Sequence, residues 1–360
     1  MQDRTKNIII TIGFVIILAI VFVANLIAED KTISTSERRK LAQFPEINVS
    51  KILSGDVIDK WEKYVEDQFI KRDLFRGIKS FWSMNILAQK DNNNLFEKDD
   101  AIYKMEYPLS ENNIEKSAQK INEVYEKYLK DMNVYYSIIP EKNYYLENDD
   151  HLKLDYNKVQ EIMDSQLIEL EFINIRSGLE LEDYYRTDLH WKQENLEEVV
   201  KIIQNNMGLE ETGDNYEVHD KGQFYGAYYG QLATDVSPDN LYILTNETIE
   251  KCTTYNFETQ KTESVYVETN SSDRYDIFVS GATPLISIEN PNAQTDKELL
   301  LFRDSFGSSI APLLVENYSK ITLVDLRYIS STILDNYIEF NDQDVLFLYS
   351  TVVLNQNILK

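Results

Sequence analysis

The stretch LLLFRDSFGSSIAPLL, residues 299–314, places a polar turn directly after an apolar run. The run predicts a buried strand. A helix is expected to begin near Ser308 or Ser309, because Pro312 costs no hydrogen bond in a first helical turn. Ser305 would then lie on a strand-to-helix turn at the carboxyl end of a central strand, where open α/β sheets bind ligands.

The rest of the chain repeats the alternation of apolar runs and helical periodicity. Strands are predicted at 134–139, around 172–175, and at 298–302, 321–326 and 345–349, and helices follow Ser110 and run through 159–170 and 196–207. Such alternation predicts an α/β domain with a mostly parallel sheet and helices on both faces. Residues 209–296 are rich in Thr, Tyr, Asn and Gly and are predicted to form an inserted β-rich segment.

A second polar stretch, YYRTDLHWKQEN at residues 184–195, contains Asp188 and His190. In an extended backbone the two side chains point to the same side. Asp188 could then orient the imidazole of His190 while the other ring nitrogen faces Ser305, as in a nucleophile–base–acid row. Singly, Asp188 is as compatible with a cap, His190 with a buried polar residue and Ser305 with a turn. Their joint placement favours a catalytic site.

Other features argue against several kinds of site. The remaining histidines, His151 and His219, lie among acidic or irregular residues, and none of the three histidines has metal-ligand spacing, so no zinc site is predicted. The sequence shows neither a phosphate-cradling glycine loop nor a dinucleotide fingerprint, so no cofactor is predicted. A single cysteine, Cys252, allows no intramolecular disulfide.

The chain is strongly acidic, with a formal net charge of −25 from 36 basic and 61 acidic residues. Phosphate backbones are bound by basic surfaces, so a nucleic-acid partner is not expected.

Residues 8–28 form an uninterrupted apolar run, long enough to cross a bilayer as a helix. Arg4 and Lys6 precede it, which by the positive-inside rule leaves the rest of the chain outside the cytoplasm. A cleaved signal peptide is the alternative. Ala28 suits a cleavage site and Leu26 does not, which favours a single-pass membrane anchor over residues 1–28.

The next segment, residues 29–95, is predicted to be a tether followed by a helical docking segment. Its stretch DVIDKWEKYVEDQF, residues 56–69, has one apolar helical stripe, which is predicted to pack into the core. The stripe comprises Val57, Ile58, Trp61, Tyr64, Val65 and Phe69. The α/β domain is expected to occupy residues 96–360.

The segments RTDLHW and FRDSFG resemble the hallmark segments of the DHHW family, which is related to the alginate O-acetylation proteins of the SGNH-hydrolase-like class. Supporting segments are SERRKLAQFP, YSIIPEKNYY, FVSGATPLI and VDLRY. The resemblance extends from about residue 36 to the end of the chain. Leu189 stands where the family name implies a second histidine, and the Gly-x-Asn-Asp stretch of SGNH hydrolases is absent from the sequence.

The resemblance implies an extracytoplasmic, SGNH-hydrolase-like three-layer domain with Ser305, His190 and Asp188 as catalytic residues. It also implies acetyl transfer to a polysaccharide, with the acyl donor supplied by a membrane-bound O-acyltransferase. Arg327 would face the sugar or an anionic donor, and Trp191 would pack beneath the histidine or stack on a sugar ring. For the oxyanion, the backbone N–H of Ser305 and a loop at Gly281 are expected.

The leading hypothesis is therefore a membrane-anchored serine acyltransferase that O-acetylates a cell-surface or exported polysaccharide. A carbohydrate esterase would use the same residues with water as the acceptor. A non-catalytic glycan-binding scaffold of the same fold is the third possibility.

Overall fold

The computed structural model describes residues 2–34, 36–37, 39–46, 56–147, 150–212, 215–268, 271 and 273–360. The chain divides into two compact units, each described separately below. The N-terminal unit comprises Met1–Asn92 and Tyr229–Asp235, and the main unit comprises Asn93–Tyr228 and Val236–Lys360. Helix α8 (Ala227–Leu232) contains the point at which the chain leaves the main unit.

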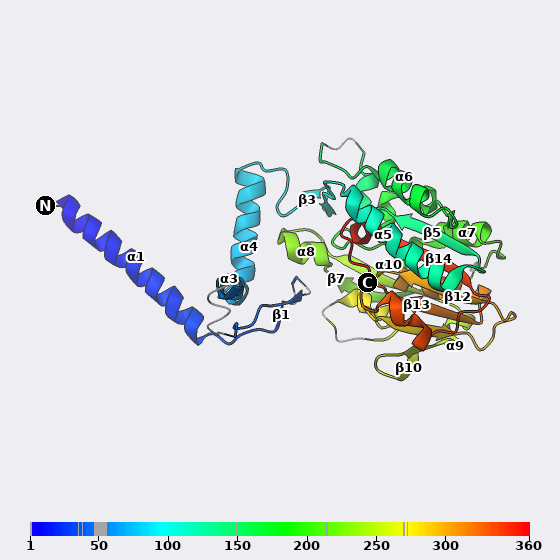
Figure 1. Ribbon diagram of the computed structural model, residues 1–360. Helices are drawn as coiled ribbons and strands as arrows, with labels where there is room; N and C mark the ends of the chain where they lie inside the picture. The colour runs from blue at the N-terminus through cyan, green and yellow to red at the C-terminus, as the bar shows by residue number, and fades with distance from the viewer. Residues whose placement is uncertain are drawn as a thin grey trace. The chain divides into compact units, whose positions relative to one another are not determined.

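The N-terminal unit is helical apart from one short strand pair (Figure 1). Its elements are α1 (Gln2–Ile27), β1 (Ile33–Ser34), β2 (Arg39–Lys40), α3 (Asp56–Gln68), α4 (Arg72–Phe81) and the π-helical turn η1 (Trp82–Ile86). Within α1, residues 4–27 are long and apolar enough to cross a bilayer. A signal peptide meets the same criteria of length and composition.

The main unit is built on a sheet that has eight strands among the described residues, in the order β10-β9-β11-β13-β12-β14-β5-β6. The strands are β5 (Val134–Ile139), β6 (Glu171–Phe172), β9 (Thr253–Asn256), β10 (Lys261–Ser264), β11 (Leu285–Glu289), β12 (Glu298–Arg303), β13 (Lys320–Val324) and β14 (Asp344–Ser350). The five strands from β13 to β6 are mutually parallel, whereas β11, β9 and β10 add antiparallel pairs at one side. The predicted α/β class with a mostly parallel sheet is confirmed.

Alternation along β12 shows how the sheet is buried on both faces. Leu299 and Leu301 join the core on one face, and Leu300 and Phe302 join the core on the other. All four side chains are at most 1% exposed. Strands buried on both faces read as continuous apolar runs, which is why this strand was visible in the sequence.

Helices cover both faces (Figure 1). Helices α5 (Glu111–Val124) and α6 (Tyr156–Gln166) pack on one core, and α7 (Glu197–Asn206) and α10 (Phe306–Ile310) on the other. The shorter helices are η2 (Tyr125–Leu129), η3 (Lys142–Tyr145), η4 (Ile175–Gly178), η5 (Leu181–Asp183), η6 (Gln193–Asn195), α9 (Glu247–Lys251), η7 (Arg274–Ile277), η8 (Ala311–Asn317), η9 (Ser331–Asn336) and α11 (Thr351–Leu354).

Residues 209–296 contribute to two separate sheets. Strands β7 (Glu217–Phe224) and β8 (Asp239–Thr245) pair only with each other among the described residues, as do β3 (Leu95–Lys98) and β4 (Ala101–Lys104). Strands β9, β10 and β11 instead extend the main sheet by antiparallel pairing.

One helix start differs from its prediction. Helix α10 begins at Phe306, directly after Ser305, rather than near Ser308 or Ser309. Pro312 lies in the first turn of the 3₁₀ segment η8 that continues α10. The helix begins earlier because the carboxylate of Asp304 accepts the N–H of Phe306, a contact between neighbours that the apolar pattern does not report.

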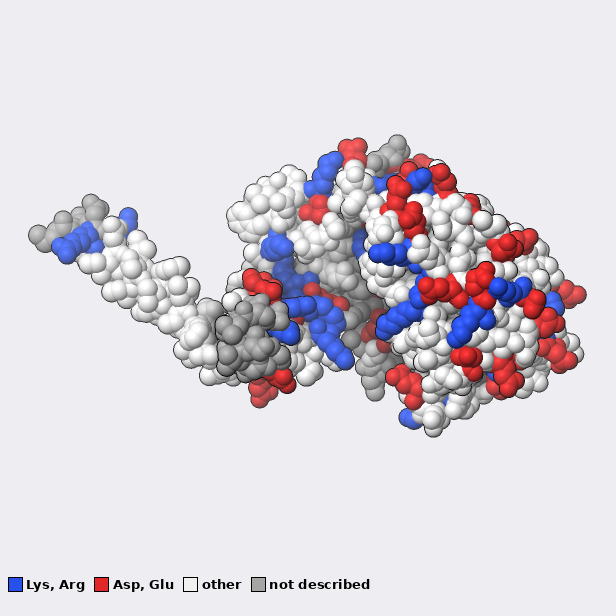
Figure 2. Space-filling view, viewed as in Figure 1, with Lys and Arg blue, Asp and Glu red and all other residues white. Residues whose placement is uncertain are grey.

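Acidic side chains are scattered over the visible face of the main unit and interspersed with lysine and arginine (Figure 2). This distribution fits a net charge of −25. It is typical of a solvated surface.

Candidate active site

Ser305 lies at the carboxyl end of β12, on the turn into α10. Asp304, which is fully buried, fixes this turn with both carboxylate oxygens. Its Oδ1 accepts the N–H of Phe306 at 3.0 Å, and its Oδ2 accepts the N–H of Ser350 from the end of β14 at 2.8 Å. The serine is therefore attached to two neighbouring strands of the sheet, and its position is set by the core.

His190 connects Asp188 to Ser305. Its Nδ1 lies 2.6 Å from Asp188 Oδ1, and its Nε2 lies 2.7 Å from Ser305 Oγ. An ionised carboxylate only accepts hydrogen bonds, so Nδ1 carries the proton, and the unprotonated Nε2 accepts from the serine hydroxyl. The histidine is 5% exposed and the aspartate is fully buried. The three predicted residues are thus brought within direct hydrogen-bonding distance.

The loop that carries Asp188 and His190 is bent, not extended as the sequence analysis assumed. A single antiparallel bridge joins Tyr184 to Trp191, and the N–H of Tyr185 donates to the carbonyl of His190. The N–H of His190 also donates to Asp188 Oδ1 at 3.1 Å. The two side chains meet because this turn folds the carboxylate back onto the histidine.

The outer oxygen of Asp188 is held from another segment. Its Oδ2 accepts the N–H of Ala227 at 2.7 Å, and the neighbouring N–H of Gly226 donates to Thr187 Oγ1 at 2.8 Å. A Cβ on Gly226 would lie 2.3 Å from the Cβ of Asp188, so only glycine allows this approach. Both carboxylate oxygens of Asp188 thus accept hydrogen bonds, Oδ1 from His190 and Oδ2 from Ala227.

Lys142 donates hydrogen bonds to the same loop. It was not predicted from the sequence as a site residue. Its Nζ donates to the carbonyl oxygens of Tyr185, Arg186 and Asp188 at 2.6, 3.0 and 2.8 Å. The side chain is 1% exposed, and this burial lowers the pKa of the ammonium group to about 8. The only signal in the sequence was its position in YSIIPEKNYY, just past the end of β5.

Asp239, at the start of β8, fixes the preceding residues of the loop. Its carboxylate accepts the backbone N–H groups of Arg186 and Thr187 at 2.8 and 2.7 Å and the hydroxyl of Thr187 at 2.5 Å. The conformation of the loop around Asp188 is therefore stabilised by side chains that are distant in the sequence. An irregular backbone can be buried in this way because its polar groups are satisfied.

Aromatic rings enclose the imidazole of His190. Tyr275 stacks on it with ring centroids 3.8 Å apart and planes 8° from parallel, and Phe306 contacts it at 4.9 Å. The Tyr275 hydroxyl donates to Ser309 Oγ at 2.7 Å. The rings restrict rotation of the histidine and exclude water from its face.

Trp191, predicted either to pack or to stack on a sugar, is fully buried. Its Nε1 donates to the carbonyl of Phe306 at 3.2 Å and to Ser309 Oγ at 2.8 Å. Its ring meets that of Phe306 edge-on at 5.3 Å. The side chain packs beneath the serine turn and presents no face to a sugar.

Arg327, predicted to face a sugar or an anionic donor, is paired within the protein. Its Nε and one terminal nitrogen donate to the carboxylate of Asp325 at 2.9 and 2.6 Å. Arg303, fully buried beside it, contacts the same carboxylate at 3.4 Å. This bidentate pair raises the pKa of the Arg327 guanidinium above its usual value, and burial lowers that of Arg303. Only 16% of the Arg327 side chain is exposed.

Gly281 was expected to supply an oxyanion donor. Its backbone N–H instead donates to the carbonyl of Phe278 at 3.0 Å. Its φ is +73°, and a Cβ would lie 2.3 Å from Asp276 Oδ1, so the glycine serves a tight turn. The structure uses this N–H within the turn, which leaves the Ser305 N–H as the remaining predicted donor.

Two buried acids lie at the same edge of the sheet. Glu106 is 5% exposed and accepts the hydroxyl of Thr351, which follows β14, at 2.6 Å. Burial raises the pKa of Glu106 to about 7. Glu141, which follows β5, accepts the backbone N–H groups of Asn143 and Lys104, and burial raises its pKa too. Neither acid was singled out from the sequence.

Comparison with known proteins supports the resemblance found in the sequence. Residues 154–324 match the family model described as DHHW protein. A DHHW family protein from Eubacterium siraeum, 21% identical, aligns over 74% of this chain and 95% of its own with a TM-score of 0.61. The resemblance to this family is confirmed, and so is the fold.

Two further solved structures are similar to this chain to different degrees. PatB1 of Bacillus cereus, solved with a sulfonyl adduct, is 20% identical and aligns over 75% of this chain and 98% of its own with a TM-score of 0.59. The O-acetyltransferase domain of AlgJ from Pseudomonas putida is 12% identical over 72% of this chain and 90% of its own, with a TM-score of 0.44. No curated protein matches the sequence.

Proposed function

From the resemblance of this chain to the DHHW family, we propose that it is a membrane-anchored serine acyltransferase that O-acetylates a polysaccharide outside the cytoplasm. The observation that carries the proposal is the pair of contacts made by His190, at 2.6 Å to Asp188 and 2.7 Å to Ser305. Nucleophile, base and orienting acid in this order form the arrangement of serine acyl-transfer enzymes.

In the proposed reaction, Ser305 Oγ attacks the carbonyl carbon of an acetyl donor while His190 Nε2 takes the serine proton. The tetrahedral intermediate collapses to an acetyl-serine, and His190 returns the proton to the leaving group. A sugar hydroxyl then attacks the acetyl-serine as Nε2 removes its proton. Collapse of the second intermediate releases the acetylated sugar and restores the serine with that proton.

Asp188 acts in this scheme by holding the imidazole and stabilising the imidazolium that forms in each half-reaction. Its own position depends on the N–H of Ala227, and the position of its loop depends on Lys142. The imidazole is further restricted by the stacked ring of Tyr275. A preorganised base of this kind spends no energy on alignment when substrate binds.

The proposed acetyl acceptor and the proposed membrane location of the protein are supported by different observations. A polysaccharide acceptor, and an acyl donor delivered by a membrane-bound O-acyltransferase, follow from the family resemblance. The membrane location rests on α1, whose residues 4–27 could span a bilayer, and on Arg4 and Lys6 at its start. With that orientation the main unit lies outside the cytoplasm.

Chemistry at the serine can be tested with a sulfonyl fluoride, a reagent class that modifies activated serines, because PatB1 has been solved with a sulfonyl adduct. Full-length protein should gain one sulfonyl group at Ser305, located by peptide mass spectrometry, and should release acetate from an activated acetyl ester. Ser305→Ala should abolish both. Ser308→Ala, on the same helix, is the matched control and should retain both.

The acceptor is tested by adding oligosaccharides to the acetyl-ester reaction. Transfer predicts a sugar product that is heavier by one acetyl group, and its amount should rise as acetate release falls. Acetate release that is unchanged by any sugar favours the carbohydrate esterase. Equal rates for wild type and Ser305→Ala would refute acyl chemistry and favour the glycan-binding scaffold.

A further inference from the structure

Helix α4 and the turn η1 bury their polar side and expose their apolar side. Ser80 and Ser83 are 2% and 8% exposed, whereas the apolar residues of the same stretch are mostly half exposed. These residues are Leu74 at 60%, Phe75 at 52%, Ile78 at 44%, Phe81 at 54%, Trp82 at 54% and Ile86 at 52%. At 100° per residue Leu74, Phe75, Ile78 and Phe81 occupy one arc of α4, so the exposed side of this helix is an apolar face. Trp82 and Ile86 are the exposed apolar residues of η1.

The buried side is polar because it binds other parts of the N-terminal unit. Arg76 donates to the carbonyl oxygens of Gly230 and Gln231 at 2.7 and 2.8 Å and pairs with Glu37 at 3.3 Å. Arg72 pairs with Glu37 at 2.5 Å. These contacts fix the rotation of α4, and with it the outward direction of the apolar face.

Helix α3 also exposes part of its apolar stripe, which was predicted to pack into the core, and Val57, Tyr64 and Phe69 of the stripe are half-buried. Ile58, Trp61 and Val65 are 69%, 44% and 42% exposed. Phe44 extends the stripe, with its ring 5.4 Å from that of Trp61 and itself 54% exposed. The prediction of core packing is therefore wrong for this helix within the described structure.

Helix α3 and the start of α4 lie near the end of the candidate membrane span in α1. Asn25, in the last turn of α1, accepts the backbone N–H of Ile70 from the α3–α4 connection at 2.8 Å. The N–H of Lys31 donates to Gln68 Oε1 at 2.8 Å, and the hydroxyl of Tyr64 donates to Asp30 at 3.0 Å. These contacts attach α3 and its connection to α4 to the end of α1.

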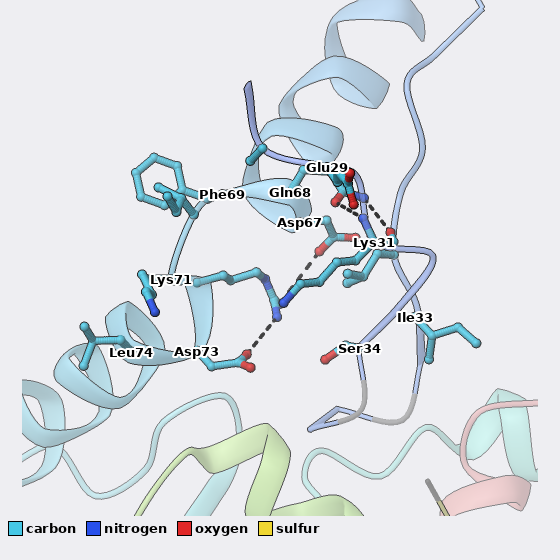
Figure 3. A pocket seen from close by; sticks show the side chains of 14 residues that line it. Glu29, Lys31, Ile33, Ser34, Asp67, Gln68, Phe69, Lys71, Asp73 and Leu74 are labelled. Atoms are coloured by element: carbon cyan, nitrogen blue, oxygen red, sulfur yellow. Dashed lines mark hydrogen bonds and ion pairs between the residues drawn. The ribbon is translucent and has the colours of Figure 1, made fainter. Parts of the chain in front are cut away.

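Figure 3 shows Glu29 and Lys31 beside Gln68 and Asp67 at the pocket between these segments. The pocket has a volume of about 560 Å³ and extends from Ala28 to the first turn of α4. Its rim carries the exposed Lys71, and the exposed Lys79 flanks the apolar face one turn after Phe75. Basic side chains beside an apolar face suit an anionic lipid surface, where their stems can extend toward the headgroups.

We propose that α3, α4 and η1 lie in the interfacial layer of the bilayer, on the side where α1 leaves it, with both apolar faces against lipid. Amphipathic helices with tryptophan on the apolar side take this position, and aromatic belts mark the same depth in spanning proteins. A large exposed apolar face attached to a membrane-spanning helix needs a non-aqueous neighbour, and lipid surrounds the end of that helix. The inference rests on the proposed membrane location but not on acyl transfer.

The three tryptophans make this testable with the full-length protein. Trp61 of α3 and Trp82 of η1 are exposed, whereas Trp191 is fully buried in the main unit. The protein is reconstituted in vesicles of phosphatidylcholine and phosphatidylglycerol with brominated acyl chains, which quench tryptophan only at contact distance. Wild-type emission should fall, each of Trp61→Phe and Trp82→Phe should lose part of the quenching, and the double variant should lose nearly all of it.

A substitution on the face gives an independent check. Ile78→Lys places a charge in the centre of the apolar face and should reduce quenching of Trp82. Ile168→Lys, at an isoleucine that is 79% exposed in the main unit, is the matched control and should leave quenching unchanged. Both sites are exposed to solvent, so neither substitution should unfold the protein.

Flotation of the same vesicles distinguishes the proposed membrane anchor α1 from the proposed lipid-facing position of α3, α4 and η1. Protein that fails to float refutes both the anchor and the interfacial helices. Protein that floats with unquenched tryptophans retains the anchor and refutes the lipid-facing position. If those unquenched tryptophans are also shielded from aqueous iodide, the face is covered by a second copy or another protein, which equally overturns the proposal.

Discussion

The ammonium nitrogen of Lys142 lies 2.8 Å from the backbone carbonyl oxygen of Asp188, whose carboxylate holds the imidazole of His190. A charge buried just past the end of β5 thus supports the loop that carries His190, the proposed base. Two further carbonyls of that loop, from Tyr185 and Arg186, share the same donor. Three bonds to one cation explain how an irregular, buried loop keeps a single conformation.

Removal of this donor should disturb both stability and chemistry. Lys142→Met leaves three buried carbonyls without their partner, and we expect a loss of about 2–4 kcal/mol in the free energy of unfolding. In the fraction that remains folded, kcat for acetyl-ester cleavage should fall while KM changes little, since the loop positions the base. Urea unfolding and steady-state kinetics measure the two effects. Lys158→Met, on the surface of α6, is the control, and a wild-type kcat for Lys142→Met would contradict the positioning role.

Gly226 offers a narrower test of how Asp188 is held. Gly226→Ala places a Cβ 2.4 Å from the carbonyl oxygen of Thr187, so the segment must shift and the Ala227 N–H must leave Asp188 Oδ2. We expect cleavage of the activated ester to fall by about tenfold or more, the equivalent of one lost alignment contact of ~1.4 kcal/mol.

The matched control for that substitution is Gly77→Ala in α4, where the nearest atom to a new Cβ is 3.6 Å away. An alanine inside a helix is expected to add up to about 1 kcal/mol of stability and to leave activity intact. Equal activities of the two glycine variants would show that the close approach at Gly226 has no catalytic consequence.

Conversion of Asp188, the proposed orienting acid, to an amide should impair catalysis without unfolding the protein. In Asp188→Asn the side-chain oxygen can still accept one hydrogen bond, but the negative charge that stabilises the imidazolium is gone. We expect ester cleavage to fall by about 10²–10⁴-fold, the range for loss of general base catalysis. Unchanged far-UV and near-UV circular dichroism would show that the fold survives, and a loss smaller than threefold would argue against the proposed role.

The buried carboxyl group of Glu106 should make the free energy of unfolding depend on pH. Its pKa is raised to about 7 by burial, from an ordinary value of 4.5. The folded protein therefore binds this proton more tightly than the unfolded chain between those pH values, and stability from this group falls as pH rises from about 4.5 to 7. The amide of Glu106→Gln can still accept the Thr351 hydroxyl without ionising.

We therefore expect Glu106→Gln to gain about 3 kcal/mol over wild type at pH 8 and little at pH 4.5. Urea unfolding at both pH values measures the difference. Glu169→Gln, at an exposed position, should show no comparable dependence on pH. A gain at pH 8 no larger than that at pH 4.5 would place the ionisation of Glu106 outside this range.

The central strands were readable from the sequence because burial on both faces leaves continuous apolar runs. β5 spans the predicted residues, and β12 and β14 extend the predicted strands by one residue or two. Gly208, two residues after the end of α7, has a φ of +65°, the left-handed conformation that commonly ends a helix. The apolar stripe of α3 was equally visible, but periodicity reports only that one side is apolar and not what covers it.

Some residues around Ser305 were also predictable from the sequence, and others were not. Ser305, His190 and Asp188 were recognised by chemical type and by the family resemblance, before any distance between them was known. Trp191 and Arg327 carried the right chemistry for a ligand, yet each is satisfied inside the protein, by Ser309 and Asp325 respectively. Lys142 was not predicted because the sequence around a single lysine after a strand does not show whether its side chain is buried or exposed.

By itself the sequence determined the α/β class, the apolar N-terminal helix and the chemical types present at the carboxyl edge of the sheet, because periodicity and residue type are local properties. Only the tertiary structure decided which of those groups meet. His190 and Ser305 are 115 positions apart in the sequence, and bonds from Lys142, Asp239 and Asp304 to backbone groups of other segments bring them together. Such bonds depend on how distant segments pack, and that packing is a property of the whole folded chain.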